Sequence, residues 1–126
     1  MPIKYHVMLR HNPRDPEAPK RYYPVVRSSG RTTQRNLAQK GARMSTLSAA
    51  DLAAGLEVLL ELIPEELMEG NIVDLGDFGS FRLSANTTGS DTLEEVKSYN
   101  IKSVNVRFTP GKAFKDAMNR ATFEKL

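Results

Sequence analysis

Apolar and polar positions alternate from the start of the chain. Every second residue from Ile3 to Leu9 is apolar, which predicts a β-strand with one covered face. Residues 12–20 hold three prolines and no apolar run, so they predict a loop. Residues 21–28 are aromatic and β-branched and predict a second strand, which Pro24 restricts to a sheet edge or a bulge. Together the two strands predict an N-terminal hairpin.

The pattern then changes to a helical period. Gly30 interrupts the chain, and a threonine after it can cap a short helix over roughly 33–43. The sequence Ser48-Ala-Ala-Asp51 has the form of a capping box. Six leucines and isoleucines follow at helical spacing up to residue 67, which predicts a long helix. Pro64 is expected to kink this helix or to start a separate last turn, and Gly70 is expected to end it.

The last third of the chain returns mainly to strand patterns. Strands are predicted over 72–75 and 81–83 around a glycine-bracketed turn, and over 101–108, where a three-residue step after Ile101 indicates a bulge. Asp91-Thr-Leu-Glu94 is a second capping-box pattern and predicts a short helix near 92–99. Residues 112–122 predict a final helix. The order β-β-α-α-β-β-(α)-β-α predicts an α+β fold.

Length and composition limit the classes of protein. With 126 residues the chain is expected to form a single domain, and its 40% hydrophobic content is globular. There is no cysteine, and the two histidines, His6 and His11, lie close together in sequence. A catalytic triad, a metal centre and a cofactor site are therefore not expected, and neither is an enzyme with a small-molecule substrate. No apolar run has signal-peptide or membrane-span length, so we expect a cytoplasmic protein without membrane contact.

Charge is distributed in three blocks. Residues 1–44 carry a net charge of +8, residues 45–101 carry −9 and residues 102–126 carry +4. A polyanion-binding surface around an acidic middle explains this distribution. Pairing of the opposite charges within the fold or between subunits explains it equally well.

Three segments, in order and with matching spacing, resemble the bacterial histone-like HU/IHF family. They are LSAADLAAGLEVLLELIPEELMEG at 47–70, VDLGDFGSF at 73–81 and VRFTPGKAFKDAMN at 106–119. The N-terminal strand pair is similar to that of the HU-related subfamily called HU-HIG. The resemblance implies a helical base with a β-saddle over 31–126, an N-terminal hairpin extension over 1–30, and a homodimer whose two chains share one core. Phe78, Phe81, Phe108, Phe114 and the leucines of 52–67 are expected in that core.

One segment departs from the family pattern. HU proteins carry long β-arms that end in a basic tip, whose proline wedges between base steps. The corresponding residues 84–103 hold no proline and include three acids, Asp91, Glu94 and Glu95. A remodelled, shortened arm is therefore expected. Its apolar residues are predicted to pack inward along one helix face, so DNA would be bound without a sharp kink.

The resemblance implies a nucleoid-associated protein that binds double-stranded DNA through phosphates with little sequence preference. Lys112 and Lys115 match basic positions of the family, and a solvated helix face is the alternative for them. The other basic residues that we expect at DNA are Arg107, Lys102, Arg82, Lys97, Arg31, Arg35 and Arg27. In the N-terminal region basic residues surround Tyr22 and Tyr23. This combination of basic and aromatic side chains is suited to binding nucleic acid. Alternatively, the two tyrosines only pack the hairpin onto the rest of the protein. A dimeric protein-interaction module that has lost DNA binding is the alternative function.

Overall fold

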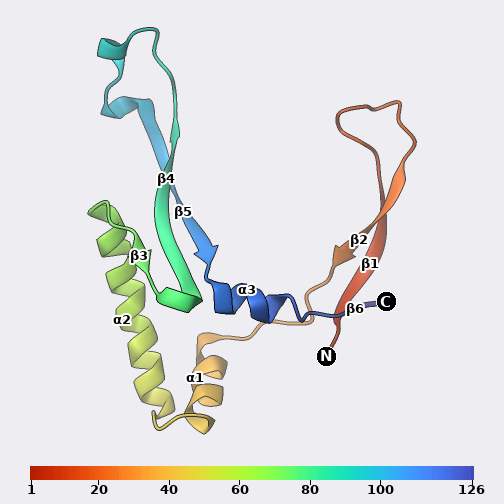
Figure 1. The fold of residues 1–126 in the computed structure, drawn as a ribbon, viewed down its shortest axis with the longest axis vertical. Helices are drawn as coiled ribbons and strands as arrows, with labels where there is room; N and C mark the ends of the chain where they lie inside the picture. Colours follow the sequence, from red (N-terminus) through yellow and green to blue (C-terminus); the bar gives the residue numbers. More distant parts are fainter. The chain divides into compact units, whose positions relative to one another are not determined.

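The computed structural model describes all 126 residues and divides them into two compact units. The larger unit is Gln34–Ala117, and the smaller unit combines Met1–Thr33 with Met118–Leu126. Three α-helices and two three-stranded sheets give a mixed α+β fold, which confirms the predicted class (Figure 1). None of the helices combines the length and the apolar character that crossing a bilayer requires.

Two helices form a hairpin in the larger unit. Helix α1 spans Gln34–Arg43 and helix α2 spans Ala49–Met68, close to the predicted limits. The capping box is confirmed, because the Asp51 amide donates to Ser48 Oγ at 3.0 Å and the Ser48 amide donates to Asp51 Oδ2 at 3.3 Å. These two bonds satisfy backbone donors that every helix start leaves free.

The end of α2 differs in part from its prediction. The helix continues through Pro64 to Met68, so a separate last turn does not form. Loss of one backbone donor at Pro64 leaves the neighbouring helical bonds in place. Gly70 ends the helix as predicted, with φ at 89°. Its amide donates to Leu67 O, and the Asn71 amide donates to Glu66 O, which is the Schellman arrangement.

A long two-stranded ribbon dominates the sheet of the larger unit. Strand β3 (Val73–Asp74) leads through a 3-10 turn into β4 (Gly79–Thr87), which pairs antiparallel with β5 (Ile101–Pro110). Asn86 pairs with Ser103 and Thr87 with Ile101, so Lys102 is the extra residue of a bulge. The bulge therefore lies at the three-residue apolar step after Ile101, where the sequence predicted it.

The segment between β4 and β5, residues 88–100, is called the arm tip below. It contains two short 3-10 helices, Leu93–Glu95 and Ser98–Asn100, and the α-helix predicted near 92–99 is absent. The second capping box was also a wrong prediction, because no side chain caps the first 3-10 helix. The backbone is held instead by Asn100, the one buried polar residue of the chain.

The C-terminal region corrects the prediction of a long last helix. Helix α3 spans only Lys112–Met118, and Phe123–Lys125 form strand β6. This strand pairs in parallel with β1 (Ile3–Arg10), which pairs on its other side with β2 (Arg21–Val26). The predicted hairpin is confirmed, and the unpredicted β6 completes a three-stranded sheet in the smaller unit.

The chain has few buried side chains. Besides Gly79, only Ala38, Leu67 and Asn100 are buried, and the exposed surface is 10,878 Å². A compact protein of 14.1 kDa exposes about 6,700 Å², and two separate bodies of these sizes expose about 8,000 Å². The predicted aromatic core is therefore incomplete in one chain: Phe78 is 53% exposed and Phe108 is 39% exposed.

Candidate nucleic-acid interface

The β4–β5 ribbon has one polar face. Successive side chains of a strand point to opposite sides, and the pairing of β4 with β5 sorts them into two sets. We call one set the polar ribbon face: Ser80, Arg82, Ser84, Asn86, Ser103, Asn105, Arg107 and Thr109. Arg82 and Arg107 lie directly opposite each other, and both are exposed.

Side-chain hydrogen bonds order this face. Arg107 Nε donates to Ser84 Oγ at 3.3 Å, and Asn86 Nδ2 donates to Ser103 Oγ at 2.9 Å. Asn105 Nδ2 donates to Asn86 Oδ1 at 3.3 Å. These serines and asparagines were missed as site residues, although their alternation is visible in the sequence. They hold part of the face in one geometry and offer hydroxyl and amide groups to a ligand.

The charge of the ribbon is uncompensated. The two strands contain Arg82, Lys102 and Arg107 and no acidic residue. Within 4.0 Å the only ion pair of the chain joins Lys4 to Glu124 in the smaller unit. Ion pairs within either unit therefore do not explain the charge blocks. A bound polyanion or a second subunit is left as the source of the balancing charge.

Helix α3 begins at the base of the ribbon, and packing fixes its position. The Gly111 amide donates to Phe78 O at 3.1 Å, and a Cβ on Gly111 would lie 2.3 Å from Asp77 O. The Phe114 ring makes edge contacts with the rings of Phe78 and Phe108, at centroid distances of 5.7 and 6.0 Å. The exposed Lys112 and Lys115 are therefore carried on a firmly placed helix next to the ribbon.

A network around Asn100 holds the arm tip together. Its Nδ2 donates to Thr88 O at 2.9 Å and to Ser90 Oγ at 3.1 Å, and its Oδ1 accepts from the Lys97 amide at 2.8 Å. Lys97 thus lies between the two 3-10 helices, and the bulge at Lys102 follows at the start of β5. Both lysines are exposed.

The apolar residues of the arm tip correct a prediction. Leu93 is 86% exposed and Tyr99 is 64% exposed, with Val96 and Ile101 above half, so they do not pack inward. Without the predicted α-helix there is no single helical face on which they could gather. Inward packing therefore no longer supports the expectation of unkinked DNA, which now rests on the absence of a proline from residues 84–103 and on the repulsion between the tip acids and phosphates.

The opposite face of the ribbon is apolar and borders a groove. This groove has a volume of about 530 Å³. We call it the apolar groove; its walls are side chains of α2 and of the ribbon, including Leu56, Leu60, Ile63, Phe81, Val104 and Val106. Leu60 is 67% exposed and Val104 and Val106 are each 60% exposed. A single chain thus leaves uncovered the face that its leucine periodicity was expected to bury.

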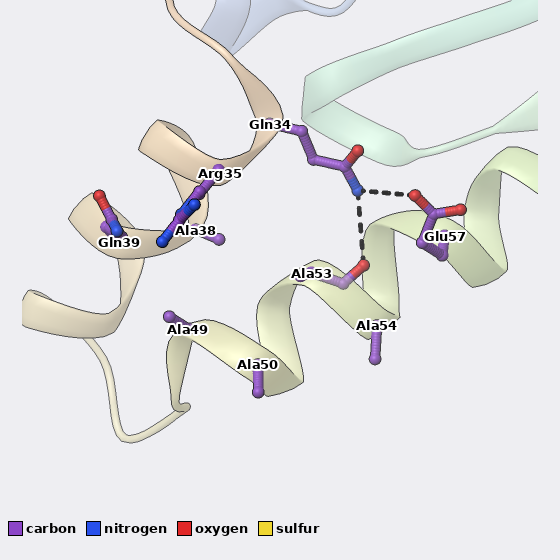
Figure 2. A pocket seen from close by; sticks show the side chains of 9 residues that line it. All are labelled: Gln34, Arg35, Ala38, Gln39, Ala49, Ala50, Ala53, Ala54 and Glu57. Atoms are coloured by element: carbon purple, nitrogen blue, oxygen red, sulfur yellow. Dashed lines mark hydrogen bonds between the residues drawn. The ribbon is translucent and has the colours of Figure 1, made fainter.

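Three expected DNA contacts lie elsewhere. Arg35 lines a second groove of about 530 Å³ between α1 and α2, beside four alanines of α2 (Figure 2). There Gln34 Nε2 donates to Glu57 Oε1 at 3.3 Å and to Ala53 O at 3.5 Å. Arg27 and Arg31 belong to the smaller unit. The structure therefore gathers Arg82, Arg107, Lys102, Lys112 and Lys115 on the ribbon and α3. It places Lys97 at the arm tip and Arg35 beside the groove between α1 and α2, and it assigns Arg27 and Arg31 to the other unit.

The comparisons with known proteins agree with this architecture. The family model HU-HIG, described as an HU domain fused to wHTH, Ig, or Glycine-rich motif, matches residues 1–125. The chain belongs to the HU-HIG family. Over 82 residues it is 40% identical to DNA-binding protein HU-alpha of Escherichia coli and of Salmonella typhimurium, covering 61% of this chain and 88% of each relative.

A solved structure has a similar fold. It is a crystal structure from Bacteroides vulgatus ATCC 8482, described as a candidate bacterial DNA-binding protein. The TM-score is 0.68 at 17% sequence identity, and the match covers 98% of this chain. This chain spans 48% of the length of that solved chain.

Proposed function

We propose that this HU-HIG family member is a histone-like, non-enzymatic protein that binds duplex DNA with little sequence preference as a homodimer. In this proposal residues 31–126 form an HU-like helical base with a β-saddle, residues 1–30 form an extension, and the protein is nucleoid-associated in the cytoplasm. The family membership and the names of the HU-alpha relatives support DNA as the partner.

The polar ribbon face is the observation that carries the proposal. Arg82 lies opposite Arg107, the strands contain no acid, and hydroxyl and amide groups fill the remaining positions of that face. Guanidinium, hydroxyl and amide groups are common donors to phosphate oxygens. With Lys112 and Lys115 at the ribbon base, the cations form a surface suited to a DNA backbone, whose affinity comes mainly from displaced counterions.

The exposed apolar surface supports the proposal of a homodimer. The apolar groove is uncovered, and the chain exposes roughly 2,900 Å² more than two compact bodies of its size would. A stable protein interface buries about 800 Å² per partner, so this excess is large enough for one. In a two-fold symmetric dimer, the leucines and the ribbon of each copy would cover the apolar groove of the other copy.

Titration of duplex DNA at several salt concentrations tests the proposal. We expect similar affinities for unrelated sequences and a linear fall of log affinity with log salt. Arg82→Gln combined with Arg107→Gln should weaken binding to all sequences equally and flatten the salt slope. The matched control is Lys40→Gln with Arg43→Gln, which removes the same charge from α1 and should have a smaller effect. Equal slopes for the two double variants would contradict a role for the ribbon.

A dimeric protein-interaction module is the second candidate. The observation in its favour is the arm tip, where the exposed Leu93 lies beside Glu94 and Glu95 in a larger unit of net charge −3. An exposed apolar side chain among acids suits a basic protein surface. Absence of salt-dependent duplex binding from an intact dimer would favour this candidate over DNA binding.

A further inference from the structure

The sheet of the smaller unit has two different faces. The β1–β2 register places Tyr5, Val7, Leu9, Tyr22, Pro24 and Val26 on one side, which is apolar. The opposite side carries Lys4, His6, Met8, Arg10, Arg21, Tyr23 and Val25, and we call it the cationic face. The smaller unit as a whole has nine Lys and Arg against three Asp and Glu, a net charge of +6.

Like charges meet across the strands of the cationic face. Arg10 pairs directly with Arg21, and the Arg27 amide donates to Lys4 O at 2.8 Å, which brings those two cations opposite each other. Like charges in directly opposed positions destabilise a sheet unless an anion lies between them. Glu124 of β6 pairs with Lys4 at 2.6 Å, whereas no carboxylate lies within 4.0 Å of Arg10 or Arg21. One end of the face is therefore partly neutralised, and the other end lacks an anion.

An exposed aromatic ring adjoins the unneutralised end. Tyr23 is 43% exposed and pairs across the strands with Met8, which is 41% exposed. Arg21 and Tyr23 are two residues apart on one strand, so their Cα atoms lie about 6.8 Å apart on the same face. A ring and a guanidinium at this spacing can accept one base and the phosphate beside it.

We propose that the cationic face binds single-stranded nucleic acid, with phosphates at Arg10 and Arg21 and a base stacked on Tyr23. A single strand offers a free base face for stacking on an aromatic ring, whereas the bases of a duplex are already stacked on one another. This site is separate from the duplex surface proposed for the ribbon and lies in the other unit.

The two adjacent tyrosines provide the test, because they lie on opposite faces of β2. We measure binding of fluorescent oligo(dT) to the full-length chain by anisotropy, with Tyr23→Ala and Tyr22→Ala as the matched pair. Loss of one base stack should weaken binding about 5- to 150-fold for Tyr23→Ala. Tyr22, which is 74% exposed on the apolar face, should tolerate the change within about twofold. Equal losses for both variants would overturn the proposal.

Further variants separate stacking from general charge and from misfolding. Tyr23→Phe should retain oligo(dT) binding, and Tyr23→Leu should lose it while circular dichroism stays native. Arg21→Gln should reduce the salt slope by about 0.7, the value for one phosphate of a single strand. Heparin has no bases, so Tyr23→Leu should leave heparin binding unchanged; oligo(dT) binding that is equally unchanged in Tyr23→Leu would mean a general polyanion surface and would overturn the stacking. Tyr23→Leu should weaken oligo(dT) binding both in the unmodified chain and in Arg82→Gln with Arg107→Gln, and it should leave duplex binding by the ribbon in place, so failure of duplex binding and failure of this site are distinguishable.

Discussion

Replacing Leu60 by glutamate tests whether a second copy fills the apolar groove. Leu60 projects from α2 into this groove and is 67% exposed in the single chain. In the proposed dimer it would be covered, so the substitution places a carboxylate in an apolar interface. The same replacement of Leu93 in the arm tip, where the side chain is 86% exposed and outside the groove, is the matched control.

The expected magnitude follows from the exposed fraction of Leu60. Burying a whole leucine contributes about 1.5–3 kcal/mol, so covering the exposed two thirds contributes about 1–2 kcal/mol per chain. Two-fold symmetry doubles this to about 2–4 kcal/mol, before the cost of desolvating two carboxylates. We therefore expect Leu60→Glu to raise the dimer dissociation constant at least 100-fold, which corresponds to about 2.7 kcal/mol.

Sedimentation equilibrium and light scattering over nanomolar to micromolar concentrations measure this change. The unmodified chain and Leu93→Glu should remain dimers at micromolar concentration, and Leu60→Glu should shift toward monomer or lose its cooperative unfolding. A monomer mass for the unmodified chain at micromolar concentration would refute the dimer. An unchanged dissociation constant for Leu60→Glu would refute the groove as its interface.

Three other predictions follow from the structure. Asn100→Asp retains the acceptor for the Lys97 amide but loses the donor to Thr88 O, so exchange of the Thr88 amide, which donates to Asn100 O, should accelerate about 5- to 150-fold, which corresponds to about 1–3 kcal/mol; unchanged exchange would contradict the network. Gly111→Ala should lower the melting temperature, because its Cβ would meet Asp77 O, whereas Gly55→Ala in α2 meets nothing within 4 Å and should raise stability by about 0.5–1 kcal/mol. Because the arm-tip acids repel phosphates, the protein should not promote circularisation of DNA fragments shorter than about 150 bp; accelerated circularisation that Leu93→Gln abolishes would make Leu93 a wedge.

Local signals in the sequence predicted much of the larger unit. The pair Ser48 and Asp51 encodes its own capping box within four residues, and the three-residue apolar step after Ile101 encodes the bulge at Lys102. Gly70 supplies the positive φ at which α2 ends. Each of these features depends on neighbouring residues, so a single sequence suffices to find it.

The remaining features depend on contacts between distant residues. Strand β6 has three residues and exists because Ile3–Tyr5, more than a hundred positions away, offer a parallel partner. In the arm tip the Asp91–Glu94 pattern suggested an α-helix, but Asn100 satisfies the backbone of this segment in another conformation. The expected DNA contacts show the same division: the alternation placed Arg82 and Arg107 on strands, and only the register revealed that they are opposite each other.

Salt dependence of duplex DNA binding tests the central claim most directly. We compare the unmodified chain with Lys112→Ala plus Lys115→Ala, and use Lys40→Gln plus Arg43→Gln as the control of equal charge. The claim predicts linear log–log plots, equal affinity for unrelated sequences, and a slope less steep by up to about 3.6 in the lysine variant, since a dimer loses four contacts at about 0.9 each. A slope near zero for the unmodified chain, or the same slope for all three proteins, would contradict the claim.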